Sequence, residues 1–278
     1  MTRRVVLPLT LSFVALATLA VAGVATGLIG WPPGGRFETI YAFDRFAREL
    51  PQRWGSAETG GDYIIRGGEG RVDVDGSVGT MHLPKPGSTK LAMLGDVEAL
   101  DVDVRVRIAW DKWPVAGRQF AYIEVRAQED LAYRPKLVLA PNGSVEVSAG
   151  RVVDGGEAEL GSTVTVAGLE QGAGEYIWLR ARVVGTNPTQ IMVRAWADGS
   201  PEPVDWPYTV TDATEALQVP GAIGIRAYLG LQAGNAPATV SFDDLLITRA
   251  EPLESTDGQA SIVRNRAHTN AVGWLRST

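Results

Sequence analysis

The feature that most constrains how this chain folds is a pair of segments, Tyr176–Val184 and Gln190–Ala197. In each segment apolar side chains occupy every second position, with polar or aromatic side chains between them. Such alternation with period two is typical of strands that have one face in a core. The five residues that join the segments include Gly185, Asn187 and Pro188, which predicts a hairpin loop. We therefore expect an antiparallel β-hairpin here.

The register of this hairpin follows from its two apolar faces, because a slip of one residue would turn one strand's apolar side chains to solvent. A register centred on Asn187 places Trp178 opposite Trp196 and Arg180 opposite Arg194. Two directly opposed arginines repel each other unless a carboxylate, a phosphate or a polar ligand lies between them. The polar face of the hairpin is therefore the first candidate for a functional site.

Composition excludes several classes of function. The chain has 278 residues, of which 45% are hydrophobic, so it can bury a full core in one principal domain. Its net charge of −6 offers no basic field to a nucleic-acid backbone, and nucleic acid is not an expected partner. The absence of cysteine excludes disulfides, thiolate metal sites and thiol nucleophiles. The two histidines, His82 and His268, lie far apart in the sequence, which disfavours a histidine-based zinc site or a Ser-His-Asp triad.

Residues 1–35 are expected to form a signal-anchor or transmembrane helix and a linker. Arg3 and Arg4 precede an apolar run, Val5–Trp31, which has no charged residue and exceeds the roughly 20 residues needed to span a bilayer. The small-x-small sequence Ala20–Ala22 leaves cleavage open, but the chain stays apolar after it, which favours an uncleaved membrane anchor. In both cases the rest of the chain is predicted to be extracellular or at the cell surface.

Residues 36–250 are expected to form an all-β domain, an antiparallel β-sandwich. Nearly every segment in this range alternates with period two, and Gly-Gly, Pro-Asn-Gly and Asp-Gly turns separate the segments. Besides the hairpin, the expected strands are Ile40–Phe46, Tyr63–Arg66, Arg71–Val74, Val78–Leu83, Leu100–Trp110, Phe120–Ala127, Lys136–Ala140, Ser144–Arg151, Glu159–Val166, Ala222–Leu229 and Thr239–Thr248. Residues 251–278 lose the alternation and are expected to be a C-terminal tail, either frayed or folded as a short docking helix.

A series of short motifs along residues 39–248 resembles a family of surface domains from bacteria (actinobacterial type) and phages. These domains have the concanavalin A-like, laminin-G-like jelly roll. In chain order the motifs are Phe43–Phe46, Trp54–Ala57 with Thr59–Gly61, Tyr133-Arg134 with Lys136-Leu137, Gly185–Pro188, Trp196 with Gly199, Glu202-Pro203 and Trp206, and Ser241–Asp244. The resemblance implies this jelly roll, and a function among lectins, glucanases and adhesion modules, because the fold carries all three. The glucanases have Glu-x-Asp-x-x-Glu on one strand, and the nearest stretch here, Glu98–Asp103, has different intervals.

The side chains that alternate with the core positions on the expected strands form a candidate ligand-binding face. In such a jelly roll the polar side of the concave sheet usually receives sugars. Aromatic rings offer flat apolar platforms to a sugar, while arginine and glutamate hydrogen-bond its hydroxyl or carboxylate groups. The predicted ligand-binding residues are Tyr122, Glu124, Arg126, Trp178, Arg180, Arg194, Trp196, Arg226 and Tyr228, with Arg182 and Met192 on the same face. The alternative is that these side chains cover one another, with arginine stacked on tryptophan and Glu124 neutralised by an arginine.

A structural calcium ion is the one cofactor that the sequence suggests. Asp44 lies in the first expected strand and Asp243 in the last, and in related β-sandwich modules such pairs hold calcium through hard oxygen ligands. The alternative is that each aspartate pairs with an arginine.

These features predict an exported, membrane-tethered, lectin-like domain that binds a glycan or cell-surface polysaccharide without catalysis. One alternative is a glycoside hydrolase or polysaccharide lyase of the same fold that uses Glu124 with an acid from the Glu202 loop. A second alternative is a structural envelope or adhesion module that binds protein.

Overall fold

The computed structural model describes residues 39–68, 70–170 and 172–251. The predicted signal-anchor segment, and all but the first residue of the predicted C-terminal tail, lie outside the described residues. Within these ranges no helix is both long enough and apolar enough to cross a membrane. The described chain is all-β, with one 3-10 helix, η1 (Glu215–Leu217), and no α-helix.

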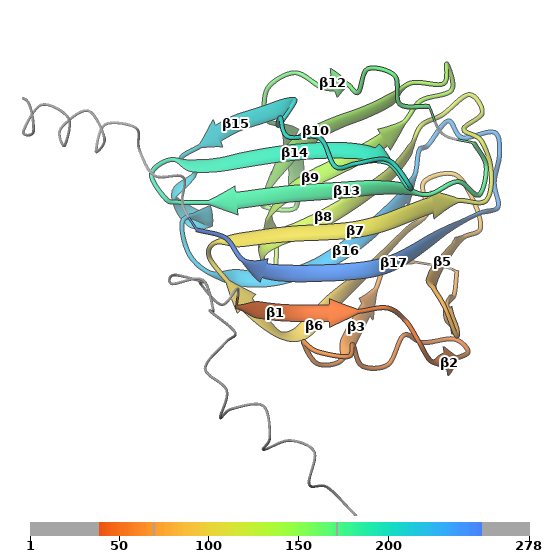
Figure 1. Ribbon diagram of the computed structural model, residues 1–278, viewed down its shortest axis with the longest axis horizontal. Helices are drawn as coiled ribbons and strands as arrows, with labels where there is room; N and C mark the ends of the chain where they lie inside the picture. Colours follow the sequence, from red (N-terminus) through yellow and green to blue (C-terminus); the bar gives the residue numbers. More distant parts are fainter. Residues whose placement is uncertain (1–38, 69, 171, 252–278) are drawn as a thin grey trace, which may run out of the picture. The chain divides into compact units, whose positions relative to one another are not determined.

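Two antiparallel sheets pack against each other, and Figure 1 shows β14, β13, β7 and β17 of the first sheet in front of β9, β8 and β16 of the second. The first sheet has nine strands in the order β15-β14-β13-β7-β17-β5-β4-β2, with β1 also paired to β17. Its strands are β1 (Ile40–Asp44), β2 (Glu49–Leu50), β4 (Val72–Asp75), β5 (Gly79–Leu83), β7 (Val102–Trp110), β13 (Ile177–Val184), β14 (Thr189–Ala197), β15 (Tyr208–Asp212) and β17 (Ala238–Arg249).

The second sheet has eight strands in the order β11-β10-β9-β8-β16-β6-β3, with β12 also paired to β10. Its strands are β3 (Tyr63–Arg66), β6 (Thr89–Ala99), β8 (Gln119–Gln128), β9 (Leu131–Leu139), β10 (Val145–Val153), β11 (Gly156–Glu159), β12 (Val164–Thr165) and β16 (Gly221–Leu229). The expected sandwich is therefore confirmed over the described residues. Three strands were not predicted, namely β2, β6 and β15, and the expected strand Glu159–Val166 is replaced by the two short strands β11 and β12.

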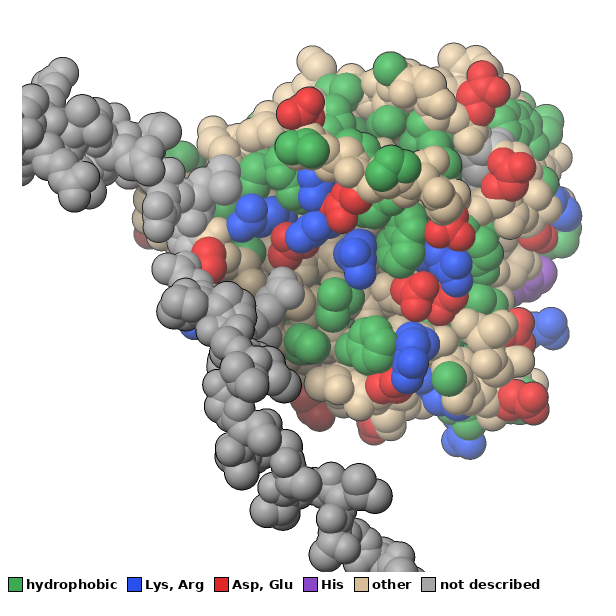
Figure 2. Space-filling view, in the orientation of Figure 1, with side chains coloured by type: hydrophobic (Ala, Val, Ile, Leu, Met, Phe, Trp, Pro, Cys, Tyr) green, Lys and Arg blue, Asp and Glu red, His purple; other side chains and the backbone are tan. Residues whose placement is uncertain are grey.

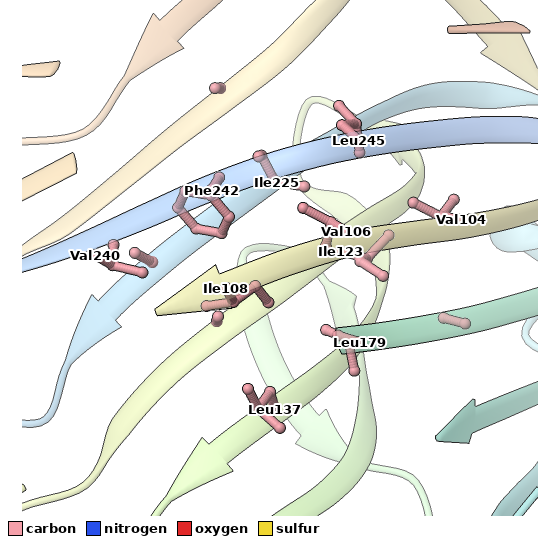
Figure 3. Packing of buried hydrophobic residues seen from close by; sticks show 14 of the residues in the cluster. Val104, Val106, Ile108, Ile123, Leu137, Leu179, Ile225, Val240, Phe242 and Leu245 are labelled. Carbon is pink, nitrogen blue, oxygen red and sulfur yellow. The ribbon is translucent and has the colours of Figure 1, made fainter. Parts of the chain in front are cut away.

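The inward side chains of both sheets form one core (Figure 3). The first sheet contributes Val104, Val106, Ile108, Leu179, Val240, Phe242 and Leu245, and the second contributes Ile123, Leu137 and Ile225. All of these side chains are buried, and removing apolar surface from water contributes about 25 cal/mol per Å² to folding. Because the core separates the sheets, the polar positions of each sheet lie on a separate outer face of the sandwich.

Candidate functional site

The central hairpin has the register that its sequence predicts. Trp178 pairs with Trp196 and Arg180 with Arg194 across β13 and β14. A carboxylate lies between the two opposed arginines, because Glu202 in the loop after β14 accepts a 2.7 Å hydrogen bond from Arg180 Nη1 and forms an ion pair with Arg194. The repulsion expected from the sequence is therefore neutralised within the chain.

The tryptophans on this face are covered by neighbouring side chains. The rings of Trp178 and Trp196 stack on each other with centroids 5.9 Å apart, and the guanidinium of Arg105 lies 5.0 Å from the Trp178 ring. In the same way Arg194 lies 4.1 Å from the ring of Trp206. Figure 2 shows basic and acidic side chains interleaved over the outer face of the first sheet. These contacts match the alternative in which the side chains cover one another.

The nine predicted site residues do not share one face, which corrects the expectation from strand parity. Trp178, Arg180, Arg194 and Trp196 lie on the outer face of the first sheet, whereas Tyr122, Glu124, Arg226 and Tyr228 lie on the outer face of the second. Arg126 lies on neither face, because it is fully buried. The reason is that β8 pairs with β16 and β9, and β13 pairs with β7 and β14, so the two groups belong to different sheets. Glu124 and an acid of the Glu202 loop therefore do not meet as the two carboxylates of one catalytic site.

On the second sheet, cross-strand pairing aligns the polar side chains in rows. The middle row, from β10 to β3, is Ser148, Lys136, Tyr122, Arg226, Leu91 and Arg66. A row on one side is Val138, Phe120, Tyr228 and Thr89, and a row on the other side is Glu124, Gly224, Met93 and Ile64. The face is thus aromatic towards Phe120 and aliphatic towards Met93, with charged side chains between.

The aromatic part is a continuous cluster of three rings. The Phe120 ring lies 6.0 Å from the Tyr122 ring, in a stacked arrangement, and 5.6 Å from the Tyr228 ring. Arg226 and Lys136 lie over the Tyr122 ring, at 5.8 and 5.6 Å from its centroid. Tyr122 itself is nearly buried, so Phe120 and Tyr228, both half-buried, provide the accessible ring surface.

A chain of ion pairs crosses the same face. Glu124, which is 2% exposed, accepts hydrogen bonds from Arg134 Nε at 2.8 Å and from Arg226 Nη1 at 3.5 Å. Arg134 Nη1 also donates to Glu157 at 2.9 Å, and Lys136 Nζ donates to Glu157 at 2.7 Å. Burial raises the pKa of Glu124 above its usual range, although both arginines oppose the shift. For Glu157, burial is outweighed by the bonds and charges of Lys136 and Arg134, which lower its pKa.

These two carboxyl groups are expected to give opposite pH dependences of stability. A carboxyl with a raised folded-state pKa stabilises the protein below its unfolded pKa, about 4.3, and loses this contribution as pH rises through the folded value. We therefore expect the free energy of unfolding of the wild type, relative to Glu124→Gln, to fall as pH rises above about 4.3. Relative to Glu157→Gln it should rise with pH and become constant above about 4.3. Urea denaturation of the three proteins between pH 3 and 8 measures both differences, and slopes of the same sign would contradict this assignment.

A pocket of about 430 Å³ opens beside Glu124 on this face. Its charged lining includes Arg66, Glu124 and Arg134, and its apolar lining includes Ile64, Leu91, Met93, Leu131 and Ala222. Gly224 presents no side chain on this face. A Cβ atom there would lie 2.4 Å from the Ala92 carbonyl oxygen, so the close approach of β16 to β6 requires glycine. This volume is within the range of small-molecule sites, which join an apolar lining to a few fixed polar groups.

Several residues of this site were missed from the sequence. Leu91 and Met93 belong to β6, a strand that was not predicted, and Glu157 belongs to β11, where the predicted strand began at Glu159. A signal for Arg134 and Lys136 was present, because they are charged residues two positions apart next to an expected strand, which places them on one face.

The two aspartates proposed as calcium ligands are each paired with an arginine. Asp44 is fully buried and binds Arg48 through both oxygens, at 2.7 and 2.9 Å, while Asp243 forms an ion pair with Arg107 on the outer face of the first sheet. Asp44 pairs with the inward-facing Leu245, so the two carboxylates point to opposite sides of the sheet. Among the described residues no group of three or more potential metal ligands occurs. This arrangement does not fit a joint calcium site.

Comparison with known proteins gives a fold likeness at low similarity. No family model matches the chain, and no curated protein matches its sequence. Among solved structures, the carbohydrate-binding module CBM66 from Bacillus subtilis has a TM-score of 0.44 and 11% identity over 66% of this chain and 94% of that one. The exoplasmic/lumenal domain of VIP36, in a Ca²⁺/Man3GlcNAc-bound form, has a TM-score of 0.48 and 11% identity over 78% of this chain and 94% of that one. A beta-1,3-glucanase from Mycobacterium marinum has a TM-score of 0.45 and 15% identity over 76% of this chain and 100% of that one. At these values the likenesses carry no argument about function, which must be inferred from the site.

Proposed function

We propose that this protein is a carbohydrate-binding domain of concanavalin A-like type and that its glycan site is the outer face of the second sheet. The observation that carries the proposal is that one outer face holds both the pocket beside Glu124 and the cluster of the Phe120, Tyr122 and Tyr228 rings. A sugar ring can lie on the accessible faces of Phe120 and Tyr228 while Arg226 hydrogen-bonds its hydroxyl groups. The apolar part of the pocket lining then receives a less polar part of the same ligand.

The proposed activity is binding without turnover. Glycoside hydrolysis needs two carboxyl groups that flank the scissile bond at a defined separation. Glu124 is almost completely buried, and its Oε1 accepts from both Arg134 and Arg226, so it is held in ion pairs on this face. The sequence around Arg3, Arg4 and the apolar run Val5–Trp31 supports the further proposal that the domain is exported and tethered to a membrane.

Glycan binding is expected to depend on the aromatic cluster of the second sheet. In Tyr228→Ala a sugar loses its ring platform, and binding on a broad glycan array should weaken by roughly 1–3 kcal/mol, taking base–aromatic stacking as the nearest measured analogue. Trp113→Ala is the control, because Trp113 is a 37% exposed residue of the loop between β7 and β8 and is not part of this ring cluster. Circular dichroism verifies that both variants are folded.

Three results would contradict the proposal. The first is a wild-type protein that binds nothing on the array. The second is binding that survives Tyr228→Ala but is lost in Trp178→Ala, which would move the site to the first sheet. The third is release of reducing ends from a polysaccharide that is abolished by Glu124→Gln, which would indicate an enzyme.

A further inference from the structure

A row of three arginines crosses the outer face of the first sheet, opposite the proposed glycan site. Arg105 on β7 pairs with Arg180 on β13, and Arg180 pairs with Arg194 on β14. The row therefore contains two neighbouring arginine pairs, and each pair needs an anion to offset the repulsion between like charges. Glu202 supplies this anion between Arg180 and Arg194.

The carboxylates near the other arginine pair, Arg105 and Arg180, already form ion pairs within the chain. Asp103 accepts from Arg180 Nε at 2.7 Å and from Arg180 Nη2 at 2.8 Å, and it lies 3.4 Å from Nε of Arg182. Arg180 Nη1 donates to Glu202. Each nitrogen of the Arg180 guanidinium thus has a partner, and Asp103 is divided between two arginines.

Arg105 has no such partner in the part of the chain that the structure describes. No carboxylate there lies within ion-pair distance of it, and its Nε atom is buried without a hydrogen bond. Its guanidinium rests on the ring of Trp178, which fixes its position without neutralising its charge. Leu246 of β17 pairs with Arg105 on the other side and offers no acceptor in its side chain. A buried donor without an acceptor is destabilising, and Arg105 also lines an open pocket, so an acceptor that enters this pocket would meet its guanidinium.

A pocket of about 280 Å³ opens at this point, lined by Asp103, Arg105, Arg180, Leu246 and Thr248. A water molecule occupies about 30 Å³ of the liquid, so the pocket has room for a group of several heavy atoms. The fork of an arginine matches the two oxygens of a carboxylate, and such charge-assisted pairs are stronger than neutral hydrogen bonds. Asp103 in the wall disfavours a group of higher negative charge such as phosphate.

We propose that this pocket is a second ligand site and that it binds a carboxylate group through Arg105. The ligand class is an acidic molecule with an accessible carboxylate, such as an acidic sugar or an acidic side chain. The site lies across the sandwich core from the proposed glycan face, and its existence is independent of that function.

The test uses the full chain labelled with ¹⁵N in its arginines and tryptophans, and it follows the arginine Nε–Hε and tryptophan indole signals by NMR. The Arg105 signal is the one that disappears in Arg105→Lys. Sodium acetate should shift this signal saturably in the millimolar range, whereas sodium chloride at the same ionic strength should not. The Arg71 signal, identified with Arg71→Lys, is the control, because the Arg71 side chain is 70% exposed and pairs with Asp73 at the surface.

Sulfate and phosphate titrations distinguish the kind of anion. A response to sulfate or phosphate without a saturable response to acetate would overturn the assignment to a carboxylate. A shift that is linear, equal for acetate and chloride, or equal at Arg71 and Arg105 would overturn the site itself. Circular dichroism confirms that Arg105→Lys is folded. Arg105→Gln keeps most of the side-chain volume and provides a second variant. In this variant acetate should produce no saturable shift of the neighbouring Trp178 indole signal.

Discussion

Trp54→Ala should lower the free energy of unfolding by about 3–5 kcal/mol, as expected for removal of a buried indole from a packed core. The Trp54 side chain is fully buried and contacts three other rings, with centroids 5.1 Å from Phe46, 5.2 Å from Tyr63 and 5.9 Å from Phe242. Its Nε1 donates a 3.1 Å hydrogen bond to the Thr80 carbonyl oxygen, which would lose its partner as well. Urea denaturation of wild type and variant at pH 7 measures the difference.

The matched control for this substitution is Trp113→Ala, which removes the same side chain from a 37% exposed loop position. We expect its effect to stay below about 1 kcal/mol, because the large losses arise from cavities in the core. Equal losses in the two variants would show that Trp54 does not hold the two sheets together as its contacts indicate.

The same ring cluster explains what the sequence motifs could predict. Phe46, Trp54 and Phe242 each belong to a motif that carries the family resemblance, and in the structure they contact one another around Trp54. The motifs therefore report on the packing of the segment between β1 and β3 against β17. Residues of this kind predict a fold, but they carry no information about a ligand.

Alternation predicted the interior of the sandwich for the same physical reason. On β7, β13 and β14 every second side chain is buried in the core, and the pairing of Trp178 with Trp196 follows directly from that period. Even the need for an anion between Arg180 and Arg194 could be inferred, and Glu202 meets it. These features depend on local geometry, which a sequence specifies.

The location of the candidate site could not be inferred in this way. Alternation separates inward from outward residues, but it does not say to which of two sheets a strand belongs, so strand parity alone predicts Glu124 and Trp178 on one face. The strand β6 was missed because Leu91 and Met93, which point outward, are apolar, and Lys90, in an alternate position, is buried. The absence of a clean period in β6 therefore concealed the apolar lining of the pocket. A strand that is apolar on its solvent side is itself a sign of a binding surface.

Arg126→Met should also lower the free energy of unfolding by about 3–5 kcal/mol, because it leaves several buried acceptors without a donor. Arg126 is fully buried, and its guanidinium donates to the carbonyl oxygens of Leu100 at 2.9 Å, Leu217 at 2.9 Å and Gly185 at 2.8 Å, and to Thr189 Oγ1 at 2.7 Å. Its backbone has φ of +50° where β8 loses register with β9, which turns the side chain away from the face that strand parity assigns to it. Arg126 thus joins β8 of the second sheet to the end of the β13–β14 hairpin in the first.

The comparison that tests this role pairs Arg126→Met with Arg126→Lys and Arg71→Met in urea denaturation at pH 7. Lysine keeps the charge but cannot reach acceptors on four sides at once, so Arg126→Lys should recover only part of the loss. Arg71→Met removes an exposed arginine and its surface ion pair, and surface pairs contribute about 0–1 kcal/mol. A loss below about 1 kcal/mol in Arg126→Met would show that methionine packs well enough to replace the buried hydrogen bonds. A full recovery in Arg126→Lys would show that the charge near Asp101, 3.7 Å from Arg126 Nη2, matters more than the bonds to the carbonyl groups.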